Sequence, residues 1–81
     1  MSHTPHELHQ EFPQAADRIS HLKATDSHFA GLAEAYHVLN RSIHRMETDL
    51  DPVADAVLED AKKQRLQLKD EIALFLEAAK A

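Results

Sequence analysis

Histidine is the residue type in this chain whose abundance most invites a chemical role. Seven His occur in 81 residues, and imidazole both binds metal ions and changes charge near neutral pH. His3, His6 and His9 recur every three residues, but a predicted helix start falls between the first two. His37 and His44 are separated by about two helical turns, too far for both to bind one metal ion. The spacing favours solvated surface histidines, and we expect no metal site.

The chain lacks the residues needed for thiol catalysis, for a nucleophilic Ser–His–acid triad and for a phosphate-binding loop. The chain has no Cys and a single Gly, Gly31, so neither thiol catalysis nor a glycine-rich phosphate loop is expected. No Ser, His and acid set accompanies a glycine-bearing nucleophile turn. We therefore predict that the protein is not an enzyme and uses no cofactor or small-molecule substrate.

Positive charge is concentrated in one stretch of the C-terminal half. Four of the nine Lys and Arg residues are Lys62, Lys63, Arg65 and Lys69. Acidic residues stand three or four positions away, the spacing of ion pairs on a helix surface, which favours a solvated helix face. The formal net charge of -5 disfavours nucleic-acid binding by the whole surface. RNA or ribosome binding through Lys62, Lys63 and Lys69, together with Arg41 and Arg45, is the second functional hypothesis.

The composition predicts that helices carry these residues. The chain has a single Gly and few β-branched residues, the residue types that favour tight turns and strands. We therefore expect one small all-α domain. No apolar run approaches the roughly 20 residues of a membrane span, and residues 2–11 lack the positive and apolar parts of a signal peptide. We expect no membrane association and a cytoplasmic location.

The N-terminal segment is predicted to be a helix over about residues 5–23, interrupted by a proline. Thr4 is a suitable N-cap, Pro5 occupies the first helical position, and Glu7 stands three residues after the cap. The apolar stripe of this helix, with steps of four and three, consists of Leu8, Phe12, Ala15, Ile19 and Leu22. Pro13 lacks an N–H and clashes with the preceding turn, so it is expected either to kink the helix or to split it.

Two longer helices are predicted over about residues 27–48 and 52–79. Thr25 or Asp26 is a suitable cap for the first, and Asp51 for the second, with Pro52 at its first position. The heptad seam of the first is Phe29, Leu32, Tyr36, Leu39, Ile43, Met46 and Leu50. The seam of the second is Ala54, Leu58, Ala61, Arg65, Leu68, Ile72, Phe75 and Ala79, widened by Val57, Leu66 and Leu76. The short connection predicts an antiparallel, coiled-coil-like helical hairpin.

Arg65 is the charged residue in the seam of the second long helix. A turn centred on residues 50–51 would place Phe29 opposite Ile72 and Tyr36 opposite Arg65. Two roles for Arg65 stay open. Its stem lies along the seam with the guanidinium in water, or it pairs with Tyr36 through a cation–π or hydrogen-bonding contact and sets the register.

The N-terminal apolar stripe has no partner in a two-helix hairpin. Its candidate interaction residues are Leu8, Phe12, Ile19 and Leu22. Folding back would make a three-helix monomer, whereas extension would leave an apolar ridge for a second copy to bury in a C2 arrangement. The leading functional hypothesis is a non-enzymatic interaction module that forms a homo-oligomer, with a dimer favoured, or docks a helical protein partner.

Several short segments occur in a characteristic order along nearly the whole chain. They are Phe12-Pro13, Ile19-x-x-Leu22-Lys23, Asp26-x-x-Phe29-x-x-Leu32, Tyr36 and the block Lys62-Lys63-Gln64-Arg65-Leu66-Gln67-Leu68-Lys69-Asp70-Glu71-Ile72. Together they resemble the YdcH-like family of small bacterial helical proteins, and the last block is the most specific part. The resemblance implies a coiled-coil-like hairpin in the cytoplasm, in a family carried as a domain of unknown function. It supplies no catalytic residues.

Overall fold

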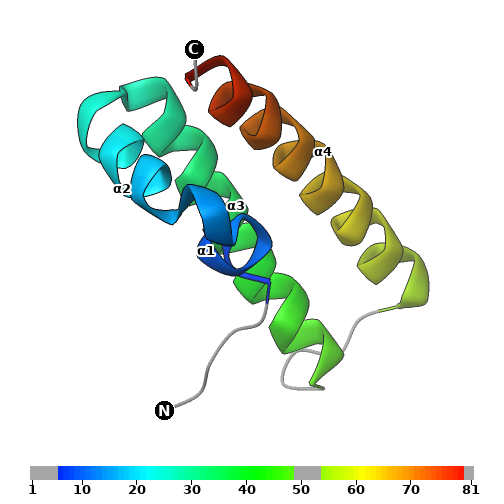
Figure 1. Cartoon of the computed structure of the whole chain (residues 1–81). Helices are drawn as coiled ribbons and strands as arrows, with labels where there is room; N and C mark the ends of the chain where they lie inside the picture. Colours follow the sequence, from blue (N-terminus) through cyan, green and yellow to red (C-terminus); the bar gives the residue numbers. More distant parts are fainter. Residues whose placement is uncertain (1–5, 49–53, 80–81) are drawn as a thin grey trace.

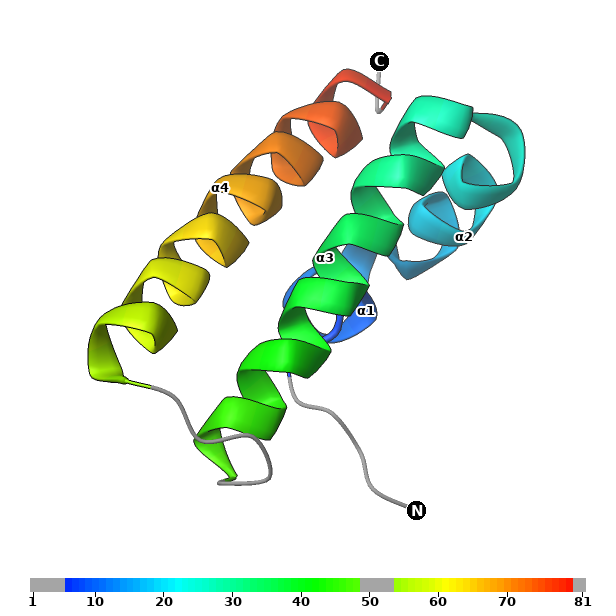
Figure 2. The same cartoon turned by 180° about the vertical axis from the view of Figure 1, so that it is seen from behind.

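The described part of the computed structural model, residues 6–48 and 54–79, is built from helices. The elements are α1 (Leu8–Glu11), the 3-10 turn η1 (Pro13–Ala15), α2 (Ala16–Thr25), α3 (Ser27–Glu47) and α4 (Asp55–Ala79). In Figure 1, α3 and α4 run antiparallel as a hairpin, and the chain before α3 folds back along α3. The view from behind in Figure 2 again places α2 and α4 on opposite sides of α3. The predicted all-α helical hairpin is confirmed.

The N-terminal arm, residues 6–25, is split at Pro13, one of the two predicted outcomes, but its first helix begins later than predicted. α1 begins at Leu8 rather than near Pro5, because His6 has a φ of 64°, in the left-handed region, and Glu7 is extended. The predicted cap, Thr4, lies outside the described residues. Pro13 begins η1 and α2 follows directly, so the helix is split at this proline.

A single residue separates α2 from α3. Asp26 is extended, with φ -130° and ψ 110°, and its Oδ1 accepts a hydrogen bond of 3.1 Å from the amide of Phe29. Asp26 was one of the two caps predicted for this helix. Its side chain accepts from an amide of the first turn, which has no acceptor within the helix. The chain therefore reverses direction at Asp26 and lays α2 against α3.

The core lies between the arm and the two helices of the hairpin. Its buried members are Leu8, Ala15, Ile19, Phe29, Ala33, Tyr36, Ile72 and Leu76, with Phe12, Leu22, Leu32, Leu68 and Phe75 packed against them. The rings of Phe29 and Phe75 meet edge to face at a centroid distance of 5.2 Å, a favourable aromatic geometry. The apolar stripe of the arm is thus covered within its own chain.

The buried stripe of α3 is rotated relative to the predicted seam. Ala33 and Asn40 are buried, whereas Leu32, Leu39 and Met46 are only half-buried. The reason is that α3 packs against two neighbours, with α2 on the side that carries Ala33 and α4 on the other. The core residues of α3 therefore face between the two neighbours rather than toward α4 alone.

The hairpin register differs from the predicted one by about one turn. Phe29 meets Phe75, three residues beyond the predicted partner, Ile72. α4 begins at Asp55, later than predicted, so the connection to α3 is longer than the short turn on which the register was based. The predicted cap and first helical residue, at positions 51–52, lie outside the described residues.

Candidate functional site

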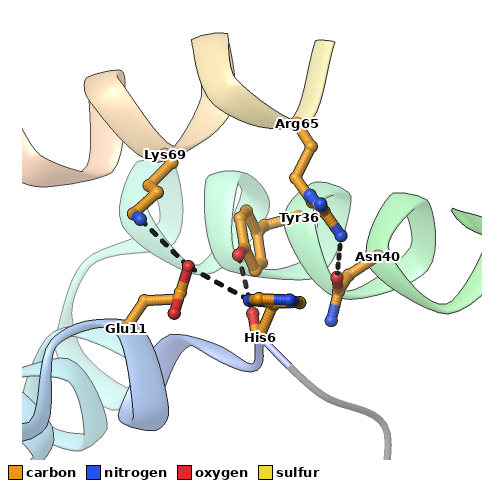
Figure 3. Close-up of polar contacts among 6 residues, drawn as sticks. All are labelled: His6, Glu11, Tyr36, Asn40, Arg65 and Lys69. Carbon is orange, nitrogen blue, oxygen red and sulfur yellow. Dashed lines mark hydrogen bonds and ion pairs between the residues drawn. The ribbon is translucent and has the colours of Figure 1, made fainter. Parts of the chain in front are cut away.

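A cluster of polar side chains joins the N-terminal arm to the hairpin, and Figure 3 shows much of it. We call it the polar clasp, and it consists of His6, Glu7, Glu11, Tyr36, His37 and Lys69. The hydroxyl of Tyr36 donates a hydrogen bond of 2.7 Å to the backbone carbonyl of His6. Nζ of Lys69 donates one of 2.9 Å to Oε1 of Glu11. The clasp therefore ties the arm to both α3 and α4.

Two contacts between histidine and glutamate complete the clasp. Nδ1 of His37 lies 3.3 Å from Oε2 of Glu7, and Nδ1 of His6 lies 3.6 Å from Oε1 of Glu11. Each contact is an ion pair only when the imidazole is protonated. Sequence reasoning treated these histidines as solvated surface residues, and the acids that meet them come from the arm, whose position was not predicted.

The clasp changes the acidity of two of its members. A hydrogen bond from Lys69 holds the pKa of Glu11 below its usual 4.5, against the opposing effect of burial. Because this folded-state pKa is depressed, the carboxylate stabilises the fold above pH 4.5, and the contribution is lost as the pH falls through the lowered pKa. Burial raises the pKa of Tyr36 from 10.0 to about 12, and the nearby Glu11 carboxylate adds to the shift.

The raised pKa of Tyr36 can be measured directly, because this is the only Tyr and the chain has no Trp. We expect tyrosinate absorbance to appear with a midpoint of about 12 in the folded protein and of 10.0 in urea. The neutral phenol thus stabilises the fold below pH 10.0, and this contribution is lost as the pH rises through about 12. Circular dichroism at each pH verifies that the chain is folded. Equal midpoints in the two solvents would contradict the buried position of the phenol.

Arg65 and Tyr36, predicted to face each other, have separate hydrogen-bond partners. Nη1 of Arg65 donates a hydrogen bond of 2.9 Å to Oδ1 of the buried Asn40, whereas Tyr36 donates to His6 (Figure 3). The polar contact of the hairpin seam is therefore Arg65 with Asn40, one turn further along α3 than predicted. A signal for it was present in the sequence, since Asn40 continues the four-three spacing between Tyr36 and Ile43.

Three of the four α4 cations in the predicted cluster contact side chains of the same chain. Their partners are Glu47 for Lys62 at 3.0 Å, Asn40 for Arg65 at 2.9 Å and Glu11 for Lys69 at 2.9 Å. Lys63 is exposed, and Arg41 and Arg45 lie on α3, where they line a shallow groove. Contacts to acidic and amide groups compete with phosphate binding, so the geometry favours the RNA hypothesis less than the sequence did.

The predicted interaction residues of the arm do not form an exposed ridge. Leu8 and Ile19 are buried, and Phe12 and Leu22 are half-buried against the same core. The arm folds back, as in the three-helix alternative of the sequence analysis. The uncovered stripe on which the predicted docking surface rested is therefore absent from the described structure.

Exposed apolar side chains are found instead on α4. Leu66 and Leu74 expose 58% and 73% of their surfaces, and Val57 exposes 49%. Leu66 and Val57 were predicted to widen the buried stripe of this helix, which is wrong. Ile72 and Leu76 are buried on the inner face, and none of the helices described in residues 6–48 lies against the outer face of α4 (Figures 1 and 2). Sequence periodicity did not distinguish the two faces, because apolar residues occur on both.

Residues 6–48 and 54–79 contain neither a metal-binding cluster nor a membrane-spanning helix. No three His, Asp or Glu side chains in these ranges lie close enough together to hold a metal ion. His3 of the N-terminal histidine repeat lies outside them. None of the helices described has both the length and the apolar character needed to cross a bilayer.

The fold and the clasp define a small all-α protein in which an N-terminal arm is fastened across an antiparallel helical hairpin. Residues 29–76, which make up most of the hairpin, match the model of a family described as "Protein of unknown function (DUF465)", and the chain belongs to this family. It is 36% identical over 66 residues to proteins named "Uncharacterized protein YdcH" from Escherichia coli strain K12 and from Shigella flexneri. These alignments cover 82% of this chain and 89% of each relative. No solved structure matches the chain. The resemblance seen in the sequence is confirmed.

Proposed function

We propose that this protein is a non-enzymatic helical interaction module that docks a partner helix on the outer face of α4. The observation that carries the proposal is the exposure of Leu66 and Leu74, at 58% and 73%, on a helix whose opposite face is buried. The two leucines are eight residues apart, or about 12 Å along the helix axis. This distance is close to that between positions i and i+7 of a partner helix, so one such helix can contact both. Burying a leucine side chain of this kind contributes about 1.5–3 kcal/mol.

Exposed charged side chains share the outer face of α4 with these leucines, and Asp70, four residues from each, lies between them. Lys63, Asp70 and Glu77 are exposed on α4 and carry both signs of charge. A face that combines leucines with charges of both signs favours an amphipathic helix with complementary charges over a uniformly charged polymer. The partner that we propose is accordingly a protein helix, and a second copy of this chain on the same face is an outcome that the test separates by mass.

We also propose that the interaction takes place in the cytoplasm, the location expected from the sequence. Fractionation of cells that produce the tagged full chain checks this location. Recovery of the chain in the soluble cytoplasmic fraction supports the proposal, and recovery in the membrane fraction counts against it.

The double variant Leu66→Gln/Leu74→Gln tests the docking surface. We expect it to keep the melting temperature of the parent, because both side chains are exposed, and to lose at least roughly tenfold in affinity for a partner captured by the parent. The matched control is Val38→Gln, which changes a residue that is 55% exposed on α3 and should leave binding unchanged. Partner binding retained by the double variant would refute the surface, and sedimentation of the isolated chain reports any self-association.

A further inference from the structure

One apolar stripe runs in a single register through α2 and α3, although the two helices are folded against each other. The stripe follows steps of three and four through Ile19, Leu22, Asp26, Phe29, Ala33 and Tyr36. Two helices of a folded-back pair need their own stripes, but nothing requires those stripes to stay in phase across the turn. The shared register means that a straight helix through residues 16–47 would carry one long, largely apolar face, interrupted at Asp26 and at Asn40.

The helical hydrogen bonds of α2 and α3 reach Asp26 from both sides, although Asp26 itself is extended. The amide of Asp26 donates to the carbonyl of Leu22 at 2.8 Å, and the amide of Ala30 donates to the carbonyl of Asp26 at 2.9 Å, both with helical spacing. Straightening would replace the side-chain cap on Phe29 with backbone bonds from residues 27–29 to the last turn of α2. The break between α2 and α3 therefore rests on one residue and its capping bond.

We propose that two copies of this chain exchange their N-terminal arms by straightening at Asp26. In the exchanged dimer, α2 and α3 form one helix, and two such helices run antiparallel with their hinges side by side. The contacts of Glu7 with His37 and of the His6 carbonyl with Tyr36 join residues on either side of this hinge. In a dimer with a two-fold axis at the hinge, each of these contacts forms between the two copies instead of within one. Both arms are then paired, so the assembly stops at two chains.

The second copy is the occupant to which these observations point, because its hairpin offers every group that the arm contacts in its own chain. The hairpin of the partner copy presents the same Lys69 to Glu11 and the same Tyr36 to His6. Neither Leu66 nor Leu74 takes part, so the exchange is independent of the docking surface proposed on α4.

Asp26 favours the closed chain over the exchanged dimer in two ways. Its carboxylate caps α3 in the closed form, a bond that a straight helix lacks. In the exchanged form, the two-fold axis brings the two Asp26 carboxylates beside each other on the apolar face, where like charges repel. Replacing Asp26 with Leu removes both effects and completes the apolar stripe.

Zero-length cross-linking of the native chain distinguishes the two forms. Nitrogen-15-labelled and unlabelled protein are mixed in urea, refolded together at high concentration and treated with a carbodiimide, which joins Lys69 to Glu11. We expect cross-linked peptides containing one labelled and one unlabelled partner, in a fraction that rises with protein concentration. Lys62 and Glu47 are the internal control, because both lie within the hairpin and their cross-link should keep a single isotope. A Lys69–Glu11 cross-link of single isotope at every concentration would overturn the proposal.

Substitution of the hinge tests its role. We expect Asp26→Leu to lower the dissociation constant of the dimer at least roughly tenfold by sedimentation and to make the mixed-isotope cross-link predominate. Asp26→Ala, which loses only the carboxylate, should shift the equilibrium in the same direction if the leucine variant fails to fold. Asp17→Leu is the control for added apolar surface on α2 and should sediment as the parent does. Folded hinge variants with the parent mass, or dimers whose cross-links keep a single isotope, would overturn the hinge.

Discussion

Replacement of Phe29 by Ala is expected to lower the free energy of unfolding by about 3–5 kcal/mol. Phe29 is 0% exposed, and its ring lies against that of Phe75 between the two long helices. The cost combines the lost burial of the ring with the cavity that the surrounding side chains leave unfilled. The free energy of unfolding of a native domain is only about 5–15 kcal/mol, so the variant should lose a large fraction of its stability.

Urea unfolding followed by far-ultraviolet circular dichroism measures the effect of Phe29→Ala. Leu74→Ala is the matched control, because it also truncates a large apolar side chain but at a site that is 73% exposed. We expect the control to change the free energy of unfolding by less than about 0.5 kcal/mol. Equal shifts in the two midpoints would place Phe29 outside the core and contradict its contact with Phe75.

The variant Arg65→Leu is expected to lower the free energy of unfolding by about 1–3 kcal/mol. The reason is that Oδ1 of Asn40, a residue 1% exposed, loses the guanidinium that donates to it. If Arg65 faced Tyr36, as the sequence predicted, the same change would extend the apolar seam and raise stability. The sign of the effect on melting temperature therefore tests the hairpin register.

The double variant Arg65→Leu/Asn40→Leu controls for the polar pair. Both polar side chains are then replaced by leucine, which removes the buried acceptor together with its donor, and most of the loss in the single variant should be recovered. Melting temperatures of the parent, single and double variants are compared under one set of conditions. A single variant that melts above the parent would refute the contact between Arg65 and Asn40.

Local signals in the sequence were sufficient for the long helices. The helix predicted over residues 27–48 corresponds to α3, Ser27–Glu47, because its cap at Asp26 and its heptad spacing are properties of neighbouring residues. The effect of Pro13 was likewise predicted, since a missing N–H acts within one turn. The starts of α1 at Leu8 and of α4 at Asp55 depend on residues outside each helix, and both helices were predicted to begin too early in the sequence.

The sequence by itself determined that the chain is all-α, where its two long helices lie, and that an apolar stripe on the arm must be covered. Only the tertiary structure decided that the arm covers it, that Asn40 receives Arg65 and that Leu66 remains exposed. Periodicity shows which face of a helix is apolar because side-chain direction repeats every 3.6 residues. The partner of that face depends on the length of the connections and the rotation of the helices about their axes, which residue spacing leaves open.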